Sequence, residues 1–156
     1  MAGLCLGGHN PAMSIARLPH KLRRFGELSL ADKWLLLRAA AWLAIARLRL
    51  AVTPFQKLIE GLSEEQGSLE PDPDLLQRVG FAVSTAAANV PWRSDCFPQT
   101  IAARSILKRH GYTSTVHLGV DRVGKDDLLG HAWLTCGDTV VTGGADLDRY
   151  TEVHRL

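Results

Sequence analysis

Residues 95–136 read DCFPQTIAARSILKRHGYTSTVHLGVDRVGKDDLLGHAWLTC, and their hydrophobic period changes part-way along. Residues 96–110 carry apolar side chains at helical spacing, and Pro98 is tolerated because backbone N–H groups of a first turn lack intrahelical partners. Gly111 suits the position just after a helix, and residues 115–120 then alternate as a strand does. Helices followed by strands that pair locally predict an α+β protein.

The remaining strands are expected to complete an antiparallel sheet. The dipeptide Gly137-Asp138 is typical of a two-residue hairpin turn, so residues 128–136 and 139–142 should pair across it. Residues 150–156 are expected to form the last strand.

A strongly apolar helix is expected near the start of the chain. Ser29, followed three residues later by Asp32, is typical of a helix N-cap and precedes the run WLLLRAAAWLAIARLRLAV at residues 34–52. Three basic side chains interrupt this run: Arg38, Arg47 and Arg49. At helical spacing they lie on opposite sides, so the helix lacks an apolar surface all round. We expect it to be buried, with an interfacial membrane helix as the alternative.

The chain divides at an acidic, turn-rich stretch, residues 63–73. Helical periodicity resumes after it, at residues 74–88. We therefore expect a loosely ordered segment at residues 1–28, an N-terminal helical region at residues 29–65 and a core unit at residues 66–156.

Composition describes an ordinary globular chain. It has 156 residues, 46% of them hydrophobic and 22% charged, which is enough for one sizeable core. The net charge of +2 is too small to indicate a nucleic-acid partner. Four cations form a basic patch near the start, Arg17, Lys21, Arg23 and Arg24. A solvated surface explains this patch, with an acidic partner or an anionic membrane surface as the alternative.

Cysteine usage favours a reducing compartment. The three cysteines, Cys5, Cys96 and Cys136, cannot all pair, and no Cys-x-x-Cys spacing occurs. The N-terminus has neither a basic n-region nor a long apolar h-region, so we expect no secretion signal and a cytoplasmic protein. No metal-binding or nucleotide-binding motif is found, so neither a metal nor a cofactor is implied.

Cys96 and His131 have the pattern of a cysteine nucleophile and its base. Cys96 follows Asp95, a residue of the N-cap type, and the positive end of a helix dipole favours a thiolate there. The alternative is an inert, buried cysteine. Cys136 lies an odd five residues from His131 on the same expected strand, so the two side chains should face opposite ways. Cys5 lies in a glycine-rich terminus without a capping context.

Asp146 is the predicted group that orients the imidazole. If Cys136 pairs with Thr139 across the hairpin turn, His131 lies opposite Gly144. Asp146 is then a diagonal neighbour on the same face, roughly 7–8 Å away between backbones. A bulge at the glycines would shift this register. The backbone N–H of Cys96 is the expected oxyanion donor, and a second donor should come from residues 89–92.

Several motifs together resemble a known family. They are Pro91-Trp92, Cys96-Phe97-Pro98, Leu107-Lys108-Arg109-His110-Gly111, Leu118-Gly119-Val120 and Gly130-His131-Ala132-Trp133-Leu134. Over roughly residues 30–156 the chain resembles the transglutaminase-like cysteine protease of lasso-peptide biosynthesis, the protease part of the B protein. The resemblance implies a transglutaminase/papain-like core, in which a nucleophile helix packs on a small antiparallel sheet, preceded by an N-terminal helical region.

The resemblance also implies a function, the removal of the leader peptide from a ribosomally made precursor. The expected partners are the precursor leader, a separate leader-recognition protein and an ATP-dependent macrolactam synthetase; a membrane partner is not expected. Some relatives place the triad acid near the position of Thr142-Gly143, so Asp146 rests on the register count. Two alternatives stay open: a transglutaminase-like amidase or acyltransferase, and a non-catalytic peptide-binding scaffold.

Overall fold

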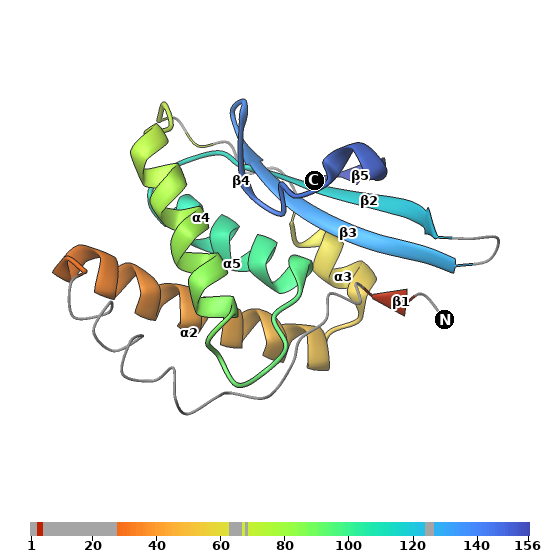
Figure 1. Ribbon diagram of the computed structural model, residues 1–156, viewed down its shortest axis with the longest axis horizontal. Coiled ribbons are helices and arrows are strands. Elements are labelled where there is room, and N and C mark those ends of the chain that lie inside the picture. The colour runs from red at the N-terminus through yellow and green to blue at the C-terminus, as the bar shows by residue number, and fades with distance from the viewer. Residues whose placement is uncertain (1–2, 5–27, 63–66, 68, 124–126) are drawn as a thin grey trace.

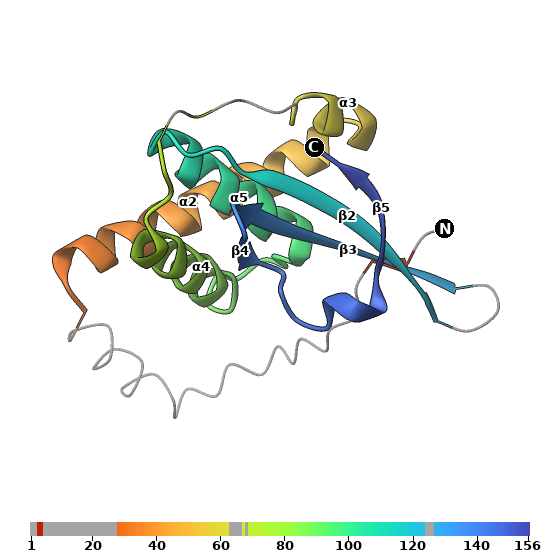
Figure 2. The same cartoon turned by 90° about the horizontal axis from the view of Figure 1, so that it is seen from above.

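The α-helices of this protein precede all but one short strand of its sheet and cover one face of it, which confirms the α+β prediction (Figures 1 and 2). The computed structural model describes residues 3–4, 28–62, 67, 69–123 and 127–156. Its helices are α2 (Leu30–Val52), α3 (Phe55–Glu60), α4 (Pro73–Ala87) and α5 (Cys96–Arg109). A short 3-10 helix, η2 (Leu147–Arg149), precedes the last strand.

The sheet is built on one long hairpin. Strands β2 (Thr115–Val123) and β3 (Asp127–Cys136) pair antiparallel along their whole length. β5 (Thr151–Arg155) adds to the free edge of β2. The other edge of β3 pairs with β4 (Thr139–Thr142) near one end and, in parallel, with β1 (Gly3–Leu4) near the other. The sequence predicted neither β1 nor α3.

Helix α2 begins where its N-cap predicts. The Ser29 hydroxyl accepts a hydrogen bond from the Asp32 backbone N–H at 3.1 Å, which satisfies one of the first-turn donors. One face of the helix is buried, through Leu35, Ala39, Leu43 and Ala46. The expectation of a buried helix is therefore correct for this face only, because the opposite face is exposed. Within the described ranges, no helix is long and apolar enough to cross a membrane.

The core lies where α2, α4 and α5 meet the sheet. Its members from α4 and α5 include Leu76, Val79, Val83, Ile106 and Leu107, and those from the sheet include Val116, Leu134 and Cys136. Helix α4 approaches β4 so closely that a Cβ at Gly80 would lie 2.4 Å from the carbonyl oxygen of Val141. Close packing of this kind fixes α5, and hence its N-terminal end, against β3.

Replacing Asp32 by Asn should destabilise the protein at neutral pH but not in acid. The hydrogen bond from Ser29, followed by that from Arg78 at 2.7 Å, lowers the pKa of the Asp32 carboxyl. A lowered folded-state pKa stabilises the protein above the unfolded-state pKa, and this contribution is lost as the pH falls through the folded-state value. Urea unfolding at about pH 7 and about pH 2 measures this. An equal difference between wild type and variant at both pH values would contradict it.

Candidate active site

Cys96 is the first residue of α5, at the positive end of the helix dipole. Asp95 occupies the N-cap position, as predicted, but its side chain makes no capping hydrogen bond. Its carboxylate instead lies 3.6 Å from Nη2 of Arg93. The first turn of α5 therefore has no side-chain cap, and its dipole is directed at the surroundings of the half-buried thiol.

The Cys96 side chain packs beside the middle of β3. It contacts a small apolar cluster made of Ala46, Leu62, Phe97, Ile101 and Ala132. Ala132 is the residue after His131, so the end of α5 is held close to the strand that carries the imidazole. Figure 1 shows this end of α5 beneath the middle of β3.

The His131 ring is held by a backbone carbonyl. Its Nε2 lies 2.8 Å from the carbonyl oxygen of Gly143. A carbonyl oxygen only accepts hydrogen bonds, so in the neutral ring Nε2 carries the proton and Nδ1 carries the lone pair. The ring also stacks on Tyr150, with 4.5 Å between centroids and 22° between planes. These contacts fix both the tautomer and the plane of the imidazole.

The aromatic side chains around His131 form a layer on one face of the sheet. Trp133 stacks on His131 at 6.0 Å and on His117 at 5.2 Å. His117, which the sequence places only on a strand, is buried, and its Nδ1 lies 3.2 Å from the Glu152 carboxylate. Tyr150 completes the group through its stacking on the His131 ring. We call His117, His131, Trp133 and Tyr150 the aromatic layer.

Strand alternation puts Cys96 and His131 on different faces of β3. Ala132 and Leu134 belong to the clusters that the helices cover, whereas His131 and Trp133 belong to the aromatic layer. Among the residues that the structure describes, no hydrogen bond joins the His131 ring to the thiol. Residues 131–133 lie between the pairings of β3 to β1 and β4, and Gly143 lies against Ala132 and Trp133 there.

The register that selected Asp146 does not hold. Cys136 pairs with Thr139, as predicted, but Leu134 pairs with Thr142 instead of Val141, because a bulge intervenes. The count that placed Gly144 opposite His131 is therefore wrong. The bulge precedes the glycines at which a slip was expected. A glycine does lie opposite His131, but it is Gly119 on β2.

Two glycines fit closely around the histidine. A Cβ at Gly119 would lie 2.8 Å from the Trp133 ring and 3.1 Å from Cβ of Tyr150. Gly143 adopts a left-handed φ of 75°, and a Cβ there would lie 2.5 Å from the Ala132 carbonyl oxygen. Only glycine brings its carbonyl to this place without strain. The Gly143-Gly144 pair was visible in the sequence, but its hydrogen bond to the ring was not.

Asp146 lies at the start of η2, in a left-handed backbone conformation with a φ of 54°. It is exposed, and its side chain makes no capping hydrogen bond. The structure brings the Gly143 carbonyl to Nε2 of His131, at the place where a triad acid was expected. The orienting role of Asp146 stays a prediction.

The loop before Cys96 holds two buried polar atoms that lack hydrogen-bond partners within the described part of the chain. They are Nε1 of Trp92 and Oγ of Ser94. A buried polar group without a partner costs free energy, so such groups are candidates for binding a substrate. Trp92 lies in the stretch expected to supply the second oxyanion donor.

Cys136 has the properties of a structural cysteine. Its thiol is buried and donates to the carbonyl oxygen of Thr113 at 3.1 Å. Burial raises the pKa of the Cys136 thiol, which keeps it protonated and unreactive. Cys5 lies outside the described residues.

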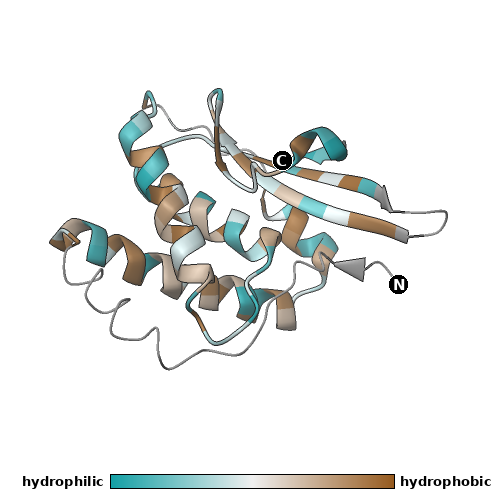
Figure 3. Ribbon diagram, viewed as in Figure 1, coloured by the Kyte–Doolittle hydropathy of each residue, from teal (hydrophilic) through white to brown (hydrophobic). Residues whose placement is uncertain are grey.

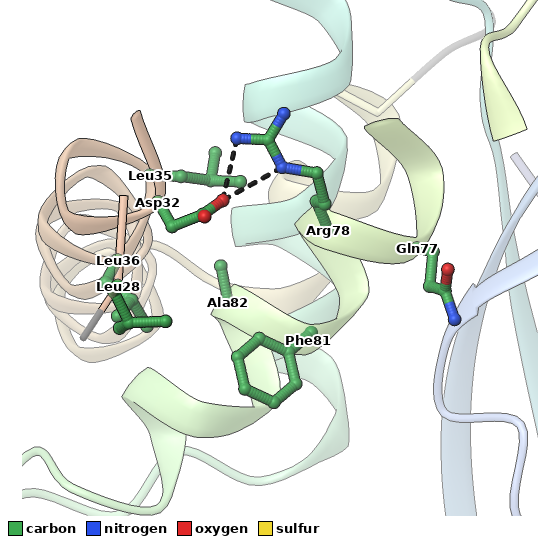
Figure 4. A pocket seen from close by; sticks show the side chains of 8 residues that line it. All are labelled: Leu28, Asp32, Leu35, Leu36, Gln77, Arg78, Phe81 and Ala82. Carbon is green, nitrogen blue, oxygen red and sulfur yellow. Dashed lines mark hydrogen bonds and ion pairs between the residues drawn. The ribbon is translucent and has the colours of Figure 1, made fainter. Parts of the chain in front are cut away.

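A cavity of about 280 Å³ lies between α2 and α4, lined by Leu28, Asp32, Leu35, Leu36, Gln77, Arg78, Phe81 and Ala82 (Figure 4). Asp32 and Arg78 point toward each other at its edge. It is distant from the Cys96 cluster, because Leu36 and Ala46 are ten residues, roughly 15 Å, apart on α2. No group of three or more metal-ligand side chains occurs among the residues with described positions.

The model of the transglutaminase-like superfamily core matches residues 37–155 of this chain. The chain belongs to the transglutaminase-like superfamily. The match includes Cys96, His131 and Gly143, and the superfamily is usually built around a Cys-His-Asp site. Neither the curated proteins nor the solved structures contain a match to the chain.

Iodoacetamide should modify Cys96 before Cys136 in the folded protein. Cys96 is half-buried at a helix start, whereas burial raises the pKa of Cys136 and limits access to it. The experiment uses a Cys5→Ser background, with each site followed by peptide mass spectrometry. The same protein in urea is the control, because unfolding should abolish the difference. Faster labelling of Cys136 in the folded state would contradict this assignment.

Proposed function

We propose that this protein is a cysteine peptidase that removes the leader from a lasso-peptide precursor, with Cys96 as nucleophile and His131 as base. Membership of the superfamily supports cysteine acyl-transfer chemistry. The observation that carries the proposal is the hydrogen bond from His131 Nε2 to the Gly143 carbonyl. It leaves the lone pair of Nδ1 as the group that can accept the thiol proton.

The proposed reaction begins when Nδ1 of His131 takes the proton of the Cys96 thiol. The thiolate attacks the scissile carbonyl carbon, and the oxyanion is stabilised at the start of α5. We assign a second oxyanion hydrogen bond to Nε1–H of Trp92, a buried donor four residues before the nucleophile. His131 then protonates the leaving amine, and water hydrolyses the thioester to release the acid and regenerate the thiol.

The thiol and the ring must come together at the edge of β3 for the first step. Core packing fixes Cys96 at the start of α5. The His131 ring is held by one hydrogen bond and by stacking on its aromatic neighbours. The ring must approach the thiol without losing its bond to Gly143, so the movement that the proposed mechanism requires is a shift of the imidazole together with Gly143.

The partners follow from the resemblance described above. We propose that the leader is presented by a separate recognition protein and that the freed core peptide passes to an ATP-dependent macrolactam synthetase. No nucleic-acid partner is proposed. A cytoplasmic location agrees with this sequence of events.

A non-catalytic peptide-binding scaffold is the second candidate function. The observation that favours it is the placement of Cys96 and His131 on different faces of β3. An amidase or acyltransferase would use the same residues as the peptidase and would differ only in the acceptor of the acyl group.

Cys96→Ala and His131→Ala should each lower the rate of precursor cleavage by about a thousandfold or more. Cleavage of a lasso-peptide precursor, presented with its recognition protein, is followed by mass spectrometry. An added primary amine separates the hydrolase from an acyltransferase, because only the latter should give mainly the amide of that amine instead of the free acid. Cys136→Ala is the control for loss of a thiol. Undiminished cleavage by Cys96→Ala would refute the peptidase, and binding without cleavage by the wild type would indicate the scaffold.

Gly143→Ala should lower kcat by about tenfold or more, because the new Cβ would displace the carbonyl that orients His131. KM should change little, since Gly143 is a positioning residue. Asp146→Asn should change kcat by less than about threefold. Thermal unfolding identifies a variant that has lost its fold. The opposite ranking would make Asp146 the orienting group and would show that the observed carbonyl contact is not the functional one.

Trp92→Phe should lower kcat by about tenfold while leaving the fold intact, because it removes the indole donor and keeps most of the ring. Trp42→Phe on α2 is the matched control, since its ring packs under Arg109 at a distance from the Cys96 loop. Equal kcat values for the two variants would contradict the oxyanion role of Trp92.

A further inference from the structure

Helix α2 exposes a second apolar face, opposite the buried one. Seven residues spaced three or four apart form it, and we call them the outer stripe: Leu30, Trp34, Leu37, Ala41, Ile45, Leu48 and Val52. Trp34 is 67% exposed and Val52 is 71% exposed. The stripe contains no polar residue and runs the length of the helix, roughly 33 Å at 1.5 Å per residue. Exposed apolar surface of this extent indicates an interaction site.

Cations border the outer stripe on both sides. At 3.6 residues per turn, Lys33 and Arg47 fall on one side of it, and Arg38 and Arg49 fall on the other. The one acidic residue of α2, Asp32, is bound by Arg78 and lies toward α4. The surface is therefore an apolar band between two rows of positive charge, and it suits an apolar partner with negative charge at its border.

Charge argues against two possible occupants. The segment at residues 5–27 carries Arg17, Lys21, Arg23 and Arg24 against one acid, Glu27, so it repeats the charge of the helix. A second copy packed antiparallel about Ala41 would pair Lys33 with Arg49. Both arrangements place like charges together, which is unfavourable.

Shape favours a flat partner. Helix α2 lies on the side of the described elements away from the sheet, as Figure 1 shows, and in Figure 2 it passes behind α5. Figure 3 shows apolar colour along most of its length, broken by short hydrophilic bands. A convex helix contacts a plane along its whole length, whereas it contacts a protein well only where that protein has a matching groove.

We propose that the outer stripe binds the protein to an anionic lipid surface. Trp34 and the aliphatic side chains enter the boundary between headgroups and acyl chains, and the bordering cations reach lipid phosphates through their long side chains. The helix lies in the plane of the surface, consistent with the finding that no described helix could cross a membrane. This inference does not depend on the peptidase assignment.

Co-sedimentation of the full chain with vesicles tests the proposal. The vesicles contain phosphatidylcholine alone or with about one-third phosphatidylglycerol. Binding to the anionic vesicles should be at least about tenfold tighter and should weaken as salt is added. The double variant Leu37→Glu/Leu48→Glu should lose this binding. Arg47→Gln/Arg49→Gln should lose the preference for anionic lipid while keeping the apolar stripe.

Val153→Glu is the matched control, because it replaces another exposed apolar side chain, 59% exposed on β5, by the same acid. It should bind vesicles like the wild type, and circular dichroism should show that every variant is folded. Three outcomes would overturn the proposal: equal binding to neutral vesicles, binding that survives in the α2 glutamate variant, or no vesicle binding at all. A protein that binds no vesicles could instead self-associate or capture an acidic protein. If the glutamate substitutions on α2 abolish that association, the outer stripe is a site for a protein partner.

Discussion

The hydrogen bond between His131 and the carbonyl of Gly143 is the constraint that holds the imidazole of the candidate site in place. It joins β3, which carries the imidazole, to the segment that leaves β4 and crosses toward β5. The carbonyl reaches the ring because a bulge shifts β4 by one residue and because Gly143 adopts a left-handed conformation. The same crossing brings Tyr150 over the ring. A change in this crossing would therefore alter the tautomer, the plane and the cover of the imidazole together.

The two apolar faces of α2 have different roles. The face with Leu35, Ala39 and Leu43 joins the core and holds α4 and α5 in place, which fixes Cys96 at the end of α5. The outer stripe contributes nothing to that core, so folding does not explain why it is apolar. Because the faces are opposite, binding at the stripe would leave the α5–β3 contact undisturbed.

The sequence predicted the elements that local patterns determine. The Ser29 cap, the start of α5 at Cys96 and the Cys136–Thr139 pair are all confirmed, since each depends on residues close in sequence. The Asp146 register count failed because one bulged residue shifts every later pairing. The Gly143 carbonyl could not be predicted, because a backbone acceptor leaves no residue-type signal. The Gly119–Tyr150 contact depends on the fold as a whole.

A carbonyl and a carboxylate orient a histidine equally well but stabilise its charged form differently. Both accept the Nε2 proton and fix the tautomer, yet only a carboxylate brings a full negative charge to the imidazolium. In the proposed mechanism Gly143 is the acceptor, so a charged pair of thiolate and imidazolium would depend more on the dipole of α5, whose N-cap residue makes no side-chain cap. The absence of a capping bond from Asp95 and the carbonyl at His131 are thus complementary. If the proposed mechanism holds, the helix start would supply the charge stabilisation that a triad acid supplies in a Cys-His-Asp site.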